Sequence, residues 1–183
     1  MHRLPKGMVS GTPAVTAIIA ALVLSLPPAL HAENLMVYIE VWDPDSLEQM
    51  EREDERLQIL YFLSAVEAGI MEAFFEADYV VFNAGPMSGA EEGGKRSDAY
   101  VLTLARDGGA DLLMRLAVRF EFLRNGVPQP DLGVLSYYRV DGGEQMLSDR
   151  MELADLIEGR IELSGEMGFK IGTEIARRVL DNS

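Results

Sequence analysis

The stretch Met114-Arg-Leu-Ala-Val-Arg-Phe-Glu-Phe122 decides the fold class, because an apolar side chain occupies every second position along it. Such alternation is typical of a β-strand with one face in the core and the other in solvent. A strand of this kind needs a helix or a second sheet to cover its apolar face. We therefore expect core positions at Met114, Leu116, Val118, Phe120 and Phe122, and a wet face at Arg115, Ala117, Arg119 and Glu121.

The segments on either side of this strand supply further strands and helices. Residues 35–42 are almost continuously apolar, which is typical of a buried central strand. Asp141-Gly142-Gly143 lies between two apolar runs and is a strong hairpin signal. The expected elements are strand 35–42, helix 60–74, strand 79–82, helix 98–106, strands 114–122, 132–140 and 144–152, and helix 167–180, with 153–163 open between a short helix and an irregular connection. This order, β-α-β-α-β-β-β-α, predicts one α+β domain over 33–183, with a mixed sheet of four to five strands and helices packed on it.

Side-chain spacing indicates how the helices are used. The buried face of the main amphipathic helix is expected at Leu60, Leu63, Val66, Ile70 and Phe74, which recur every three or four residues. Ser97 is a candidate N-cap for the second helix, and Gly108-Gly109 are candidates for its stop. Gly168 and Gly172 lie one turn apart on the last helix, which would let another element approach it closely.

The first 32 residues have the features of a signal peptide. Arg3 and Lys6 precede an uncharged apolar run over 14–26, and Pro27-Pro28 interrupt any helix before Ala32. The run suits the core of a signal peptide and is short for a membrane-spanning helix, which needs about 20 apolar residues. A lipoprotein signal requires a cysteine after the apolar run, and none is present here. We expect cleavage near Ala32 and a periplasmic or secreted domain; a retained membrane anchor is the alternative.

The residue types that remain after Ala32 narrow the possible chemistry. Both histidines, His2 and His31, precede the expected cleavage point, and the chain has no cysteine. Nucleophiles that depend on His or Cys, and zinc sites built from imidazole or thiolate, are thereby excluded. The formal net charge of −14 also makes nucleic acid and anionic membrane surfaces poor partners, because both are bound through Lys and Arg. No cofactor is expected.

The order of elements and two short motifs resemble a group of cell-envelope domains. The motifs are Gly109-Ala110-Asp111, which leads into the third expected strand, and Asp141-Gly142-Gly143, which closes the meander. In these features the chain is similar to the periplasmic domain of the curli secretion channel, to the outer-membrane activators of penicillin-binding proteins, and to the amino-terminal domain of the Tol-system propeller protein. The resemblance implies a mixed sheet with helices packed on it, and a role in binding or assembly, not in catalysis.

Two polar segments allow an alternative reading as ligand sites. Residues 89–95 satisfy the spacing G-x-x-x-x-G-K of a phosphate-binding loop, but Arg96 stands where the magnesium-binding Ser or Thr belongs. We favour the other interpretation, a flexible loop before a capped helix. Calcium is a second alternative, with candidate oxygen ligands at Asp43, Asp45 and Glu48, although the spacing departs from the calcium-loop motif and a solvated acidic loop has the same composition.

A pair of carboxylates could act as acid and base on a glycan, provided that burial raises the pKa of one of them. Glu40 is the candidate to inspect, because it lies on an otherwise apolar strand. The structural alternative for Glu40 is an ion pair with Arg115 or Arg119.

Aromatic residues provide the remaining functional signal. Each of the pairs Tyr61-Phe62, Phe74-Phe75 and Tyr137-Tyr138 must send its two rings in different directions. Exposed rings rimmed by charge mark protein interfaces, whereas helices on both faces of the sheet would bury every ring. The candidate partner-binding residues are Trp42, Tyr61, Phe75, Tyr137 and Tyr138.

The sequence therefore predicts a non-catalytic module that binds or assembles with a protein partner in the cell envelope. A carboxylate-dependent hydrolase of envelope glycan and a calcium-stabilised structural module are the alternatives, and the oligomeric state is left open.

Overall fold

The strands form one mixed five-stranded sheet. The computed structural model describes residues 32–42, 52–84, 97–122, 128–156 and 163–182. The strands are β1 (Asn34–Val41), β2 (Val80–Asn83), β3 (Leu112–Phe122), β4 (Pro128–Arg139) and β5 (Glu144–Glu152). Their spatial order is β2-β1-β3-β4-β5, in which β1 runs parallel to β2 and β3, and the β3–β4 and β4–β5 pairs are antiparallel. The predicted α+β class and element order are confirmed.

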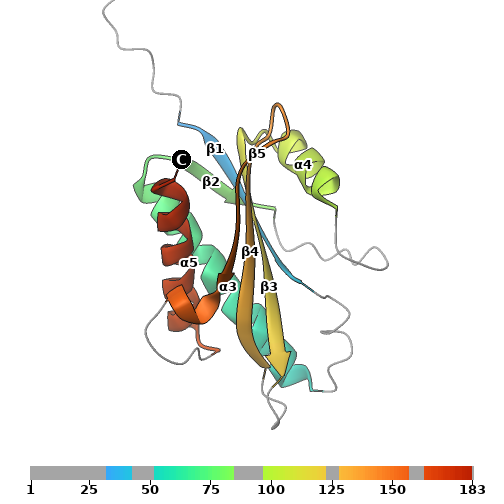
Figure 1. Cartoon of the computed structure of the whole chain (residues 1–183), viewed down its shortest axis with the longest axis vertical. Helices are drawn as coiled ribbons and strands as arrows, with labels where there is room; N and C mark the ends of the chain where they lie inside the picture. The colour runs from blue at the N-terminus through green and yellow to red at the C-terminus, as the bar shows by residue number, and fades with distance from the viewer. Residues whose placement is uncertain (1–31, 43–51, 85–96, 123–127, 157–162, 183) are drawn as a thin grey trace, which may run out of the picture. The chain divides into compact units, whose positions relative to one another are not determined.

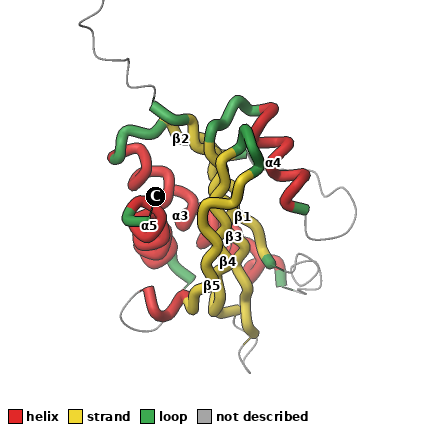
Figure 2. Tube along the Cα trace, turned by 45° about the horizontal axis from the view of Figure 1, so that its top comes forward, coloured by secondary structure: helices red, strands yellow, loops and turns green. Residues whose placement is uncertain are grey.

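Helices cover both faces of this sheet. Helices α3 (Glu53–Glu76) and α5 (Gly165–Leu180) lie together on one face, and the shorter α4 (Asp98–Asp107) lies on the other (Figure 1; Figure 2). A short 3-10 helix, η1 (Leu153–Leu156), follows β5 and occupies part of the segment whose structure the sequence leaves open. The domain therefore has three layers, and the central strands β1 and β3 are buried from both sides over much of their length, whereas most residues of β5 are exposed.

Two hydrophobic cores result, one on each face of the sheet. Alternate residues of β1 divide between them: Leu35 and Val37 pack in the larger core with α3 and α5, and Met36 and Tyr38 pack in the smaller core. The smaller core is closed by Val101 and Ala105 of α4, which are buried against the sheet together with Leu113, Tyr138 and Val140.

The second core corrects the expected wet face of β3. Met114, Leu116, Val118 and Phe120 are buried as predicted, but Arg115 and Ala117 are buried as well. Only toward the end of the strand does the predicted pattern hold, because Arg119 is half-buried and Glu121 is exposed. The alternation correctly predicts which residues share each face of β3. It does not predict that α4 covers the face that carries Arg115 and Ala117.

Helices α3 and α5 touch through their backbones. A Cβ atom added to Gly172 would lie 2.0 Å from the carbonyl oxygen of Val66, and one added to Gly168 would lie 2.7 Å from that of Phe62. Gly69 makes the reciprocal contact from α3, because its Cβ would lie 2.2 Å from the carbonyl oxygen of Phe169. The predicted close approach at Gly168 and Gly172 is thus confirmed.

The predicted caps and turns are also present. As predicted, Ser97 accepts a hydrogen bond from the amide of Tyr100 at the start of α4. Ser164, which the sequence analysis did not select, does the same for Met167 at the start of α5. Gly143 has a φ of 65° in the turn between β4 and β5, a backbone conformation that glycine adopts without strain.

Candidate functional site

Two of the predicted partner-binding residues are buried, which corrects the sequence-based hypothesis. Tyr137 is 2% exposed and packs in the larger core, and its neighbour Tyr138 is 4% exposed and packs in the smaller core. Adjacent strand residues point to opposite faces, and helices cover both faces here. Neither ring is available to a protein partner in this conformation.

The other three candidates differ in exposure. Trp42 is half-buried just after β1, where its amide donates to the carbonyl oxygen of Val118 over 2.8 Å. Tyr61 and Phe75 are 66% and 72% exposed. Both lie on α3, which makes this helix the element on which the predicted surface aromatics occur.

The solvent-facing side of α3 is apolar along much of its length. Leu57 and Leu60 are 58% and 46% exposed. Leu57 lies one helical turn before Tyr61, and Leu60 is the residue next to Tyr61 in the sequence. Exposed Ser64 and Ala68 continue the same side of the helix without adding charge. We call this surface the outer stripe; it consists of Leu57, Leu60, Tyr61, Ser64, Ala68 and Phe75.

Leu60 is a correction, because its spacing with Leu63 and Val66 predicted a core position. In the structure Leu63 and Val66 are buried, but Leu60 projects to solvent near the edge of the buried face. Leu57 was missed altogether. The signal that could have found it is the spacing of 57, 60 and 61, which repeats at three and four residues on a second side of the helix.

Acidic residues flank the outer stripe. Glu53 and Asp54 are exposed in the first turn of α3, where the helix dipole favours negative charge. Glu72 and Glu76 are exposed near the other end, where the dipole favours cations and the last turn has no basic residue. The helix dipole therefore stabilises the negative charge of Glu53 and Asp54 but not that of Glu72 and Glu76.

Helix α3 is also long and apolar enough to cross a membrane, judged by length and composition alone. In this fold one side of it packs in the larger core through residues such as Ile59, Phe62 and Ile70. A helix that is apolar on both its buried and its outer face resembles a membrane-spanning helix in composition. The apolar composition of α3 therefore comes from the outer stripe as well as from the core-facing residues.

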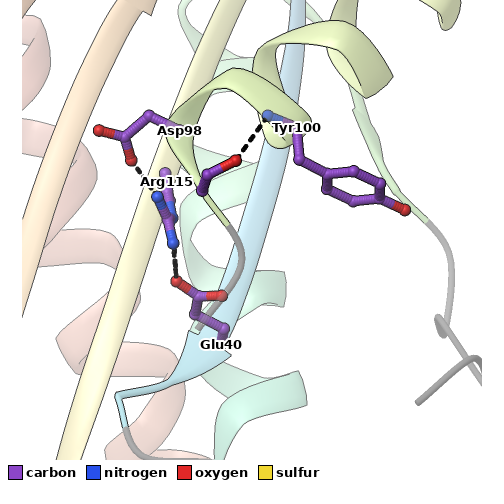
Figure 3. Close-up of polar contacts among 5 residues, drawn as sticks. Glu40, Asp98, Tyr100 and Arg115 are labelled. Atoms are coloured by element: carbon purple, nitrogen blue, oxygen red, sulfur yellow. Dashed lines mark hydrogen bonds and ion pairs between the residues drawn. The ribbon is translucent and has the colours of Figure 1, made fainter. Parts of the chain in front are cut away.

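A buried ion cluster joins the sheet to α4. Arg115 of β3 is 5% exposed, and its Nε donates to Glu40 Oε1 of the neighbouring strand β1 over 2.9 Å. Its guanidinium also pairs with Asp98, the first residue of α4 (Figure 3). Glu40 is the carboxylate singled out for possible catalysis, and the structure supports its alternative interpretation as an ion-paired residue. The cluster links β1, β3 and the first residue of α4.

Tyr138 lies beside this cluster. Burial raises the pKa of its hydroxyl, a side-chain hydrogen bond with Ser136 opposes the rise, and the nearby charge of Asp98 adds to it. The hydroxyl is therefore protonated at neutral pH.

Among the described carboxylates, Glu67 is the one whose pKa is raised. Burial of this half-buried α3 side chain is the main cause, and a hydrogen bond from Asn83 Nδ2 to Glu67 Oε2 over 3.2 Å opposes it. Asn83 ends β2, so the interaction ties α3 to the edge of the sheet.

The predicted ion and phosphate sites fall largely outside the described residues. Asp43, Asp45 and Glu48 all lie in the undescribed segment 43–51, and the segment 89–96 is likewise not described. Ser97 is described and acts as the N-cap of α4. Within the described part of the chain, no group of three or more Asp, Glu, His or Cys side chains is placed to hold a metal ion.

Comparison with known proteins gives little further information. No family model and no curated protein matches the sequence. Two crystal structures of the PelC dodecamer from Paraburkholderia phytofirmans resemble the chain with 15% and 17% identity and a TM-score of 0.42 in both cases. The first similarity covers 83% of this chain and 93% of PelC, and the second covers 81% and 89%. Likeness at this level does not establish a shared fold or function.

Proposed function

We propose that this chain is a non-catalytic binding or assembly module of the cell envelope, and that it docks a basic, amphipathic segment of a protein partner on the outer stripe of α3. The observation that carries the proposal is the exposure of Leu57, Leu60 and Tyr61 side by side on a helix whose opposite face is buried. Contiguous apolar surface of this kind, rimmed by charge, is typical of protein interfaces.

The apolar part of the stripe supplies affinity. Complete burial of one Leu or Phe side chain is worth about 1.5–3 kcal/mol. Three or four such side chains can support a specific complex after the cost of association is subtracted. Ser64 and Ala68, in the middle of the stripe, are small enough to let a partner helix approach the α3 backbone.

The acidic rim indicates the charge of the partner. Glu72 and Glu76 oppose the helix dipole at their end of α3, so a cationic partner would relieve an unfavourable interaction there. The formal net charge of the chain, −14, is negative like this acidic rim. A negative net charge would speed association with a basic segment and disfavour binding to anionic membranes and nucleic acid.

Placement in the envelope rests on the sequence, since residues 1–31 lie outside the described part of the chain. The basic start and the apolar run over 14–26 are the features of an export signal. We therefore infer a periplasmic or secreted domain after cleavage near Ala32.

The test is site-specific photocrosslinking in the native envelope, with the photoreactive residue placed at Leu57, Tyr61 or Phe75, and at Thr103 on the exposed side of α4 as the matched control position. We expect one protein to crosslink from the α3 positions and not from Thr103. A basic peptide from the crosslinked region of that protein should then bind the purified domain. Leu57→Gln/Tyr61→Gln should weaken this binding at least 10-fold, and added salt should weaken it further.

A partner captured equally from α4, or a peptide affinity unchanged by the double substitution, would contradict the proposal. The thermal stability of the double variant provides the folding control, because both replaced side chains are largely exposed.

A further inference from the structure

A cleft on the α5 side of the sheet is lined by Glu33, just before β1, and by Val179, near the end of α5. The start of β1 and the end of α5 lie at the same end of the sheet (Figure 1). Its volume is about 340 Å³, which lies within the range of sites that hold one small organic molecule. Apolar walls come from Leu112, Leu147 and Val179, and Met146 lies beside them. None of the lining residues belongs to the outer stripe of α3.

Tyr137 places an unpaired hydroxyl at this cleft. The residue is 2% exposed and lines the cleft, yet no described group forms a hydrogen bond with its hydroxyl. Every fully buried side-chain nitrogen or oxygen in the described residues has a partner, so the Tyr137 oxygen must keep a small accessible surface. Its electrostatic neighbours are Tyr79, Glu33 and Arg139, all of which line the cleft. The hydroxyl therefore points into the cleft.

Packing fixes the position of this hydroxyl. The ring of Tyr137 stacks on Phe74 of α3 with a centroid separation of 6.4 Å, and Phe74 also meets Tyr79 edge to face at 5.2 Å. Burial strongly raises the pKa of Tyr137, with smaller contributions from Tyr79 and Glu33, so the hydroxyl stays protonated at neutral pH. It can both donate and accept one hydrogen bond without adding charge to the cleft.

The charged groups of the cleft neutralise one another. Arg139 Nη1 lies 3.5 Å from Glu33 Oε1, and the other polar lining groups are the hydroxyl of Tyr79 and the amide of Asn182. That amide already donates to the carbonyl oxygen of Arg178 over 2.6 Å. A ligand with a net charge would meet no unpaired opposite charge among the described lining residues.

We propose that this cleft binds one small, uncharged, amphipathic molecule. The apolar body of the molecule would lie between Leu112, Leu147 and Val179. Its hydroxyl or carbonyl group would hydrogen-bond to Tyr137. The site is separate from the α3 outer stripe and does not depend on the function proposed for that surface.

Three related probes test the ligand class on the unmodified domain over 33–183. The probe 2-naphthol has an apolar body with one hydroxyl, naphthalene lacks the hydroxyl, and 2-naphthoate replaces it with a charge. Titration followed by amide NMR should show saturable shifts for Leu112, Leu147 and Val179. We expect 2-naphthol to bind about 3- to 10-fold more tightly than naphthalene, as one neutral hydrogen bond predicts. The anion 2-naphthoate should bind more weakly than 2-naphthol.

Two substitutions connect the binding to the cleft. Tyr137→Phe should remove the preference for 2-naphthol over naphthalene, and Leu147→Trp should fill the cleft and abolish the binding of both. Leu57→Gln, on the outer stripe, should leave the affinities unchanged. Equal binding of all three probes, an unchanged preference in Tyr137→Phe, or shifts confined to α3 around Leu57 would each overturn the proposal.

Discussion

Gly172 of α5 lies so close to Val66 of α3 that a Cβ atom at position 172 would stand 2.0 Å from the Val66 carbonyl oxygen. Real Cβ atoms do not approach backbone oxygens to this distance, and backbone atoms of a packed helix cannot move aside as a flexible side chain can. The contact sets the separation of the two helices that cover the larger core. It also holds in place the helix that carries the outer stripe.

Gly172→Ala should therefore destabilise the domain. Alanine improves helix propensity by about 1 kcal/mol, but the helices must separate to admit the methyl group. We expect a net loss of about 2 kcal/mol in the free energy of unfolding, measured by urea denaturation. Gly142→Ala is the matched control, because no atom lies within 4 Å of the added Cβ and its φ is not positive. Equal stability of the two variants would show that α3 and α5 can readjust.

Arg115→Met should cost about 3–5 kcal/mol of unfolding free energy, because it leaves the carboxylate of Glu40 nearly buried and without its cation. The double variant Arg115→Met/Glu40→Met should recover most of this loss, since two apolar side chains tolerate burial there. Asp98→Asn is the control for the exposed end of the cluster and should cost less than about 1 kcal/mol. Thermal unfolding of the four proteins in parallel distinguishes these outcomes. A double variant as unstable as the single one would mean that the cluster is required for packing and not only for charge balance.

Truncation of the two adjacent phenylalanines on α3 should affect stability very differently. Phe74 is fully buried, so Phe74→Ala should lower the free energy of unfolding by about 3–5 kcal/mol. Phe75 is 72% exposed, so Phe75→Ala should change it by no more than about 0.5 kcal/mol. Binding of a hydrophobic fluorescent dye to the folded domain should fall in the Phe75 variant, because part of the outer stripe is removed. A large stability loss at Phe75 would mean that its ring is covered in the folded domain.

Stability should depend on pH through Glu67. Burial raises its pKa in the folded state, so the folded state holds the proton more tightly than the unfolded state. The free energy of unfolding must then fall as the pH rises from the unfolded pKa, about 4.3, through the folded pKa. Glu67→Gln removes this fall, so the variant should gain stability relative to the unmodified domain between pH 4 and pH 7, with no further change below about pH 3.

Glu166→Gln provides a control of opposite sign. A hydrogen bond and the charge of Lys170 lower the pKa of Glu166, so this carboxylate contributes stability above its unfolded pKa that is lost as the pH falls. Its variant should lose stability relative to the unmodified domain as the pH rises from 3 to 7. Chemical denaturation at several pH values measures both trends. Parallel trends in the two variants would contradict the assignment of burial as the dominant cause at Glu67.

Local patterns were enough to predict the elements of this protein. Alternation along 114–122, helical spacing between Leu63 and Phe74, the cap at Ser97 and the turn at Asp141-Gly142-Gly143 all depend on neighbours within a few residues. Each is present in the structure. The close approach at Gly168 and Gly172 was also predictable, because two glycines one turn apart on a helix leave room for the backbone of another element.

The candidate surface was only partly predictable. Tyr61 and Phe75 were selected correctly as exposed rings, since each follows or precedes a residue on the buried face of α3. Leu60 was placed in the core instead, because an apolar residue near the edge of a helical face can turn either way, and Leu57, on the side opposite the core, was not considered. Which way it turns depends on where the sheet and α5 contact the helix.

By itself, the sequence determined which side chains share a face of each strand or helix, because backbone geometry repeats every two residues in a strand and every 3.6 in a helix. Only the tertiary structure decided what covers each face. The placement of α4 on the second face of the sheet buried Tyr138 and Arg115, and the packing of α3 between the sheet and α5 left one apolar side of α3 exposed. That placement is accompanied by contacts between residues far apart in the chain, such as Val101 of α4 in the smaller core with Tyr138, and no local period encodes them.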